Sequence, residues 1–305
     1  EIGGAHNIDL IFTSLQVKSL FAIIVLPKWF DVQSKITLSR LVSFEFFIVV
    51  NSFFYFITLE LNYNMKYKNI ICKNVKIIIN PFSGKGKNKF PLLESLLGIK
   101  SRRKVNLPSQ EVAKNVQAYL LKHNIKSEIY LTEYASHATE LAASSEKENY
   151  DLVIAIGGDG TINEVINGLV ETNLPLAVIP SGTANVFSLE FDIPENIELA
   201  CEKIIKGNCQ RIDLGNVGGK YFACMAGIGF DAYVIKHADK KLKKKWGPLS
   251  YIVVACKEFF TYKFSKIKIK VDNEPFFRKG YFLIVGNTKY YGGKFLATPK
   301  ADPLD

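Results

Sequence analysis

Residues 152–169 read LVIAIGGDGTINEVINGL, and this stretch decides the fold. Its first five residues form a continuous apolar run, which is typical of a strand buried on both faces of a parallel sheet. The glycines at 157, 158 and 160 then allow a tight turn. The i, i+3, i+4, i+7 spacing of an amphipathic helix follows, and its apolar positions are Ile162, Val165, Ile166 and Leu169. We therefore predict a buried strand, a glycine loop and a helix.

The same alternation extends on both sides of this stretch. Apolar or β-prone runs predict strands at 75–79, 127–132 and 176–179, and helical spacing predicts helices at 112–120 and 137–145. Strands and helices in turn, with short connections, imply right-handed βαβ units and a parallel sheet with helices on its faces.

After about residue 207 the pattern changes. Isoleucine and lysine alternate within 264–271, which predicts a strand with one wet face, and further strands are expected at 221–226 and 278–287. The predicted fold class is α/β. An α/β domain with a parallel sheet at 65–206 is followed by a second, mainly antiparallel β domain at 207–305, which we expect to be C-terminally truncated.

The first 64 residues are hydrophobic and carry no motif. The run 41–61 is long enough to span a bilayer, although Glu45, Asn51 and Glu60 interrupt it. Met65 offers an internal start. Three interpretations stay open for 1–64: translation of an upstream region, a membrane or membrane-surface anchor, and a folded extension.

Composition narrows the classes of function. The 305 residues are 48% hydrophobic and 22% charged, as in a globular chain with a sizeable core. The net charge of +10 favours anionic partners, namely nucleotide phosphates, acidic lipid surfaces or nucleic acid. Five scattered cysteines without a CxxC pair argue against a disulfide framework and a structural zinc, and four histidines without HExxH spacing argue against a zinc hydrolase.

Three glycine-centred loops follow the apolar strands, at 80–87, 157–164 and 180–185. The first adds lysines but is not a Walker A loop, because no Gly-Lys pair precedes Ser or Thr. In the second, Thr161 is expected to cap the helix, and Asp159 makes electrostatic sense only if a metal ion joins it to a nucleotide. Ligands bind at the carboxyl ends of parallel strands, so the three loops predict one phosphate site.

The motifs NPFSGKGK at 80–87, GGDGTINE at 157–164 and PSGTANVF at 180–187 resemble, in this order, the diacylglycerol kinase catalytic domain family, which includes sphingosine kinases and bacterial lipid kinases. The resemblance covers roughly 73–305. It continues through 132–138, 211–215, 227–231, Asn287, Gly292, Gly293 and 301–303. A GGDG motif alone would also suit NAD kinases or phosphofructokinases.

This resemblance implies a Rossmann-like parallel-sheet nucleotide domain at 65–206, a mainly antiparallel β-sandwich domain at 207–305, and a nucleotide in the cleft between them. With the glycines and serine of the loops, it gives an ATP site made of Asn80, Ser83, Gly84, Thr132, Gly157, Gly158, Gly160, Thr161, Glu164, Ser181, Gly182 and Thr183. It also implies that Asp159 and Asp213 are the catalytic carboxylates that organise Mg²⁺, partly through water. A lipid hydroxyl would attack the γ-phosphate directly.

Two departures from the family pattern concern the acceptor side of the reaction. Val186 stands where many relatives have an aspartate. The family's general base belongs to a stretch expected beyond Asp305, so a chain that ends there should be a poor catalyst.

The expected function is therefore an ATP-dependent lipid kinase with Mg²⁺ as cofactor. Its acceptor would be diacylglycerol or a related lipid such as a sphingoid base or phosphatidylglycerol. The alternatives are a non-catalytic nucleotide- or lipid-binding relative and an NAD kinase, but Asn163, Glu164 and the third loop favour the lipid branch.

The expected partners are ATP, a membrane lipid and an anionic membrane surface, without nucleic acid and with a homodimer as one option. The expected location is cytoplasmic, peripheral at the inner face of the membrane. The basic run 240–245, followed by Trp246, is either a solvated face or a membrane-docking patch.

Overall fold

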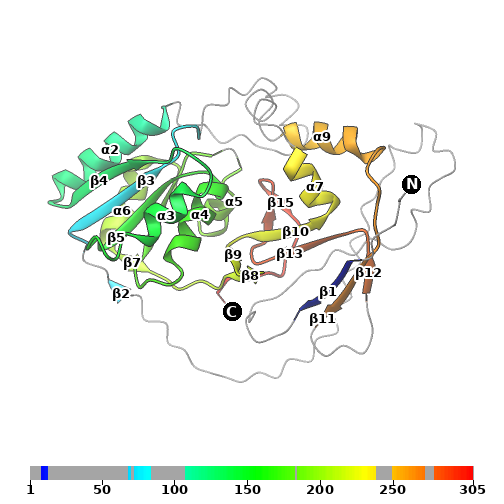
Figure 1. The fold of residues 1–305 in the computed structure, drawn as a ribbon. Coiled ribbons are helices and arrows are strands. Elements are labelled where there is room, and N and C mark those ends of the chain that lie inside the picture. Colours follow the sequence, from blue (N-terminus) through cyan, green and yellow to red (C-terminus); the bar gives the residue numbers. More distant parts are fainter. Residues whose placement is uncertain are drawn as a thin grey trace.

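The computed structural model describes residues 8–12, 68–69, 72–83, 107–182, 184–237, 249–271 and 278–304. An α/β part and a β-rich part lie side by side, with the chain running from the first into the second (Figure 1).

The α/β part is built on a four-stranded parallel sheet of order β4-β3-β5-β6. Its strands are β3 (Asn74–Ile79), β4 (Lys126–Leu131), β5 (Leu152–Gly157) and β6 (Leu176–Pro180). The chain leaves β3 toward β4 on one side and returns to β5 on the other. The loops after β3 and β5 thus diverge at a topological switch point, where open α/β sheets bind ligands.

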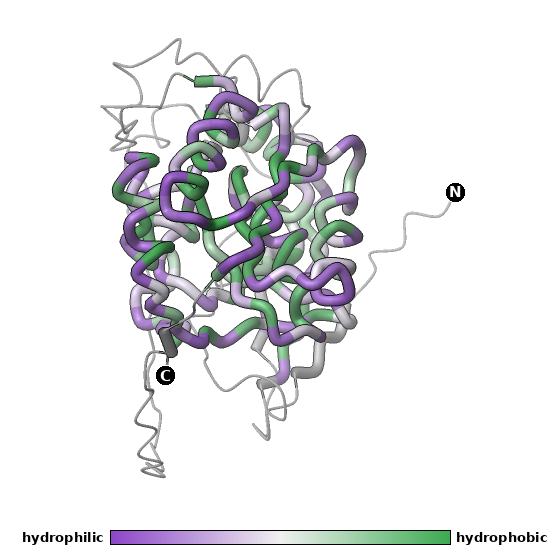
Figure 2. The backbone as a smooth tube through the Cα atoms, turned by 90° about the vertical axis from the view of Figure 1, so that its left-hand side faces the viewer, coloured by the Kyte–Doolittle hydropathy of each residue, from purple (hydrophilic) through white to green (hydrophobic). Residues whose placement is uncertain are grey.

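Helices cover both faces of this sheet, which confirms the predicted layers. One face packs against α2 (Ser109–Lys122) and α6 (Ile197–Lys206), and the other against α3 (His137–Ala143) and α4 (Asp159–Leu169). Because strand side chains alternate between faces, Ile77 joins the first core while Ile78 joins the second. Along the helices in Figure 2, hydrophilic and hydrophobic residues alternate, as expected of helices with one buried side.

Lys76 is the exception inside this buried sheet. Its side chain is fully buried, yet its Nζ donates to Ser144 Oγ at 3.0 Å and to Glu148 Oε2 at 2.8 Å. The same ammonium lies 4.6 Å from the ring centroid of Tyr130. These contacts replace the water that the charge loses.

The β-rich part confirms the predicted antiparallel pairing. The strand β10 (Met225–Gly229) pairs with β13 (Phe282–Gly286), and β11 (Ile267–Val271) pairs with β12 (Arg278–Gly280). Shorter pairs in this part are β8 (Gly215–Val217) with β9 (Lys220–Phe222), and β14 (Tyr290–Tyr291) with β15 (Phe295–Leu296). One more short pair, β2 (Lys68–Asn69) with β7 (Asn208–Cys209), lies beside the α/β part (Figure 1).

Several elements differ from the prediction. Helices α7 (Phe230–His237) and α9 (Leu249–Phe259) were not expected, and β1 (Ile8–Phe12), from the segment 1–64, adds to β11 in parallel. The strand expected at 221–226 is divided between β9 and β10. It breaks at Ala223, whose N–H donates to the side chain of Asn163 rather than to a neighbouring strand.

Two predicted features, the apolar run 41–61 and the basic run 240–245 with Trp246, lie outside the described residues. Within the residues that the structure does describe, no helix combines the length and the hydropathy needed to cross a bilayer.

Candidate active site

The first loop begins where β3 ends. Asn80 accepts the N–H of Phe82 on its Oδ1 at 2.9 Å, and its Nδ2 donates to Thr161 Oγ1 at 3.3 Å. The Ser83 hydroxyl donates to the Asn80 carbonyl at 2.7 Å. Asn80 thus joins the first loop to the second, as the sequence predicts for two loops of one site. Gly84 lies outside the described residues.

The second loop turns directly into α4. The helix N-cap is Gly158, in extended conformation, and no described side chain caps it. The prediction that Thr161 caps α4 is wrong, because Thr161 lies inside the first turn and its Oγ1 accepts the amide of Asn80 instead. An uncapped helix start leaves backbone N–H groups for an anion.

Asp159 is bound by the start of the short helix that follows the third loop. Its Oδ1 accepts the N–H of Phe187 at 3.0 Å, at the start of the short helix α5 (Val186–Glu190). Burial raises the pKa of the Asp159 carboxyl, and backbone N–H groups, first those of Phe187 and Val186, oppose that rise. The carboxylate therefore has protein partners even without a cation.

The second and third loops pack backbone against backbone. The N–H of Ser181 donates to the Gly157 carbonyl at 2.9 Å. A Cβ built on Gly182 would lie 2.4 Å from Gly158 Cα, so neither loop has room for a side chain there. The Ser181 hydroxyl is buried without a hydrogen-bond partner among the described residues. Thr183 lies outside the described part of the chain.

The remaining predicted residues are next to the loops in the chain or in the sheet. Thr132 follows β4, is buried, and donates its N–H to the Ile79 carbonyl at 2.9 Å. Glu164 lies one turn along α4, where its carbonyl accepts the Thr139 hydroxyl at 2.9 Å. Gly160, in the first turn of α4, is exposed.

Asp213 belongs to a second group of contacts, formed among residues of 207–305. Its N–H donates to the Pro303 carbonyl at 2.9 Å, and its carbonyl accepts Asn287 Nδ2 at 2.8 Å. Asn287 Nδ2 also donates to the Ala223 carbonyl at 2.8 Å. The motifs at 211–215, 287 and 301–303, far apart in the sequence, therefore meet here.

The Asp213 carboxylate fits a cation ligand. Its Oδ2 is buried and has no hydrogen-bond partner among the described residues, and such an orphaned acceptor is costly unless a water or a cation satisfies it. Asp159 fits less directly, because its Oδ1 already accepts a backbone N–H. No group of three or more His, Cys, Asp or Glu side chains in the described part forms a metal cage, so water would complete a cation's ligands.

Two asparagines to which the sequence analysis assigned no role in holding the fold, Asn163 of the second loop and Asn167 beyond it, join the two parts. Asn163 and Asn167, one turn apart on α4, bind the backbone of the segment at 221–223. Asn167 accepts the N–H of Tyr221 at 2.9 Å and donates to its carbonyl at 2.8 Å, as a neighbouring strand would. The i, i+4 spacing of two asparagines on a predicted helix was the available signal.

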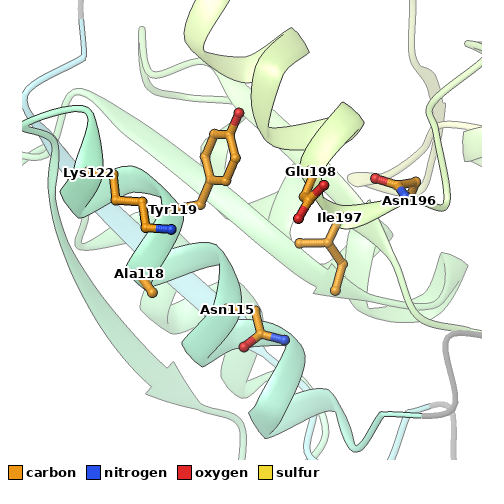
Figure 3. Close-up of a pocket in the computed structure, with 7 residues that line it drawn as sticks. All are labelled: Asn115, Ala118, Tyr119, Lys122, Asn196, Ile197 and Glu198. Atoms are coloured by element: carbon orange, nitrogen blue, oxygen red, sulfur yellow. The ribbon is translucent and has the colours of Figure 1, made fainter.

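A cavity elsewhere does not belong to this site. It has a volume of about 560 Å³ and lies between α2 and the start of α6, where Tyr119 and Lys122 face Ile197 and Glu198 (Figure 3). It shares no residue with the three loops.

Comparison with known proteins agrees with the two-part fold and with the position of the second and third loops in its first part. Residues 106–217 match the diacylglycerol kinase catalytic domain, and residues 224–305 match the YegS C-terminal NAD kinase beta sandwich-like domain. A diacylglycerol kinase of Staphylococcus saprophyticus is 33% identical over 231 residues, which are 75% of this chain and 69% of the relative. A diacylglycerol kinase of Staphylococcus aureus strain RF122 is 32% identical over 231 residues, 75% and 67% of the two chains.

Solved structures show the same fold. A crystal structure described as a candidate diacylglycerol kinase from Bacillus anthracis aligns with a TM-score of 0.57 at 26% identity, over 79% of this chain and 72% of the other. A second structure from the same organism aligns at 0.55 with 25% identity, over 76% and 72%. The chain therefore belongs to the diacylglycerol kinase family, with an α/β catalytic domain followed by a sandwich-like region.

Proposed function

We propose that this chain transfers the γ-phosphate of ATP to the hydroxyl group of a membrane lipid. Diacylglycerol is the first candidate acceptor, and a sphingoid base or phosphatidylglycerol are the others. The observation that carries this proposal is the meeting of three glycine-centred loops at the switch point of the parallel sheet. Relatives named diacylglycerol kinase support it.

In this proposal the first-turn amides of α4 bind the nucleotide phosphates, helped by Asn80 and the small residues of the third loop. Asp159 and Asp213 would hold Mg²⁺ through water, and Mg²⁺ would neutralise phosphate charge. The lipid oxygen then bonds to the γ-phosphorus as the bond to the bridging oxygen of ADP breaks. The hydroxyl proton leaves to a base outside the residues placed so far.

The test is transfer of labelled γ-phosphate from Mg-ATP to a panel of acceptors. The panel holds diacylglycerol, sphingosine, phosphatidylglycerol and undecaprenol, with NAD as the rival acceptor. Asp159→Asn and Asp213→Asn should each lower kcat by about a hundredfold or more, because phosphate neutralisation is worth several kcal/mol. The matched control is Asp192→Asn. Asp192 is exposed and has a left-handed backbone conformation with φ 48°, which asparagine adopts as readily as aspartate.

Each outcome separates the candidate functions. Label in one lipid that both site variants lose would support the kinase and name its acceptor. ATP binding with no label in any acceptor would favour a non-catalytic relative. Label in NAD would contradict the lipid assignment, and so would a loss of activity as large in Asp192→Asn.

A further inference from the structure

Helix α9 carries apolar residues on two neighbouring sides, because Val253 and Val254 are consecutive residues. One side packs on α7, where Val254 contacts Val234 and both are buried. The other side carries Val253 and Lys257 and continues into Phe260, positions that share one helical face by their spacing. Val253 is 38% exposed and Phe260 is 80% exposed. Within the described part of the chain, this exposed apolar side of α9 therefore has no partner that covers it.

A cluster of aromatic rings packs next to Phe260 at the end of this face. Phe259 packs its ring 5.5 Å from Phe264, and Phe264 lies 5.2 Å from Phe230 of α7. Phe260 contacts Phe259 edge to face at 5.7 Å. The exposed ring of Phe260 thus already packs against Phe259, so the Phe260 side chain loses little conformational entropy when a partner covers it.

Among the described residues, the most exposed charges on and next to this face are positive. The side chain of Lys257 is 80% exposed, and Lys263 and Lys266 are exposed as well. The acidic neighbour Glu258 lies 3.8 Å from the Lys257 Nζ, but its side chain is only 17% exposed and also accepts the hydroxyl of Tyr233 at 3.2 Å. The surface therefore combines apolar and cationic groups.

We propose that the α9 face, formed by Val253, Lys257, Phe260 and Lys263, docks the chain on an anionic lipid bilayer. Lysines attract anionic headgroups, and an exposed aromatic ring settles at the interface. A second copy is a poorer occupant, because a two-fold contact would bring these lysines against each other. The contacts and exposure that define this face do not depend on the proposed function. The role of docking, which is to bring the site to its substrate, rests on the lipid substrate proposed above.

The test is flotation with vesicles of phosphatidylcholine, alone or mixed with phosphatidylserine, in the absence of ATP. Val253→Ser with Phe260→Ser should weaken binding to the mixed vesicles about tenfold, through lost apolar burial. Lys257→Ala with Lys263→Ala should weaken it about fivefold per lysine and remove most of the dependence on phosphatidylserine.

Matched controls come from α2, in the α/β part. Leu121→Ser removes an apolar side chain that is 67% exposed, and Lys114→Ala removes an exposed lysine. Both should bind vesicles like the unmodified chain. All the changed residues are exposed, and urea unfolding midpoints will verify that each variant folds.

Unchanged vesicle binding in both α9 variants would overturn the proposal. So would a shift from dimer to monomer in sedimentation with vesicle binding intact, which would make the face a contact between copies. A water-soluble short-chain diacylglycerol separates docking from catalysis, because α9 variants should keep its phosphorylation and lose that of bilayer diacylglycerol. If no lipid is ever phosphorylated but the variants still lose vesicle binding, docking stands and the proposed kinase function fails.

Discussion

Among single residues, Asp159 shows how a site carboxylate can also support the fold. Its bond to the N–H of Phe187 attaches the glycine loop of α4 to the start of α5. At the other end of α5, Glu190 accepts the N–H of Lys289 at 2.9 Å, from the loop after β13. The short helix is therefore tied at both ends, first to the α/β part and then to the β-rich part.

Lys76 allows a prediction about stability. Lys76→Ala should lower the free energy of unfolding by about 3 kcal/mol, because it leaves a cavity in a closed core. Lys76→Met fills the same volume, and Glu148, whose side chain is 42% exposed, can be solvated alone. This second variant should therefore stay within about 1 kcal/mol of the unmodified chain in urea unfolding.

The same pair gives the sign of a pH effect. The hydrogen bond from Lys76, and then that from Ser144, lower the pKa of Glu148. Its contribution to stability is therefore present above the ordinary pKa of a glutamate and is lost as the pH falls through the lowered value. Lys76→Met should flatten this acid limb of the unfolding curve; an identical limb in both proteins would contradict the assignment.

At the scale of elements, the contact between the second and third loops leads to the next prediction. Gly182→Ala should cost about 2–3 kcal/mol, because its Cβ would meet Gly158 Cα and Asn185 Oδ1, at 2.4 and 2.7 Å. Backbone atoms cannot rotate away as a flexible side chain can.

Gly160→Ala is the control within the same loop. A Cβ there meets no atom of the described chain within 4 Å, and the residue lies in α4, where alanine is favoured by up to about 1 kcal/mol. Thermal unfolding of both variants measures the difference. Equal losses of stability would show that the loops do not touch as closely as the geometry implies.

The elements also show where sequence reasoning succeeds. The runs at 75–79, 152–156 and 176–179 are apolar at every position or nearly so, and each is a strand of the parallel sheet. Helix α9 was missed because its stretch is apolar without a clear stripe, so periodicity alone could not separate it from a strand.

In the candidate site, strand ends and glycines placed the three loops correctly near one another. The partners of individual side chains could not be predicted, because they come from residues distant in the sequence. Asn80 binds Thr161, and Asn287 binds Asp213. The prediction that Thr161 caps α4 failed for the same reason. Nothing in the neighbouring sequence shows that its hydroxyl oxygen accepts a hydrogen bond from the distant Asn80.

For the whole molecule, Asn163 and Asn167 connect the two parts, and replacing them should lower the stability of the whole chain. Asn167→Ala loses bonds to both backbone groups of Tyr221 and should cost about 2 kcal/mol. The double variant with Asn163→Ala should lower the unfolding midpoint by about 5 °C or more and broaden the calorimetric transition.

The exposed Asn115 of α2 provides the control, since Asn115→Ala should stay within about 0.5 kcal/mol. A double variant that melts sharply at the original temperature would mean that other contacts alone hold the two parts together.

The asparagine pair on α4 also makes the backbone of the β-rich part a reporter for the glycine loop. The N–H groups of Tyr221 and Ala223 donate to asparagines 54 and 60 residues away in the sequence. They can exchange with deuterated water only when that segment separates from α4. Their exchange should therefore keep pace with the amides of α4 itself, and a nucleotide that steadies the first turn of this helix should slow it across the boundary between the two parts.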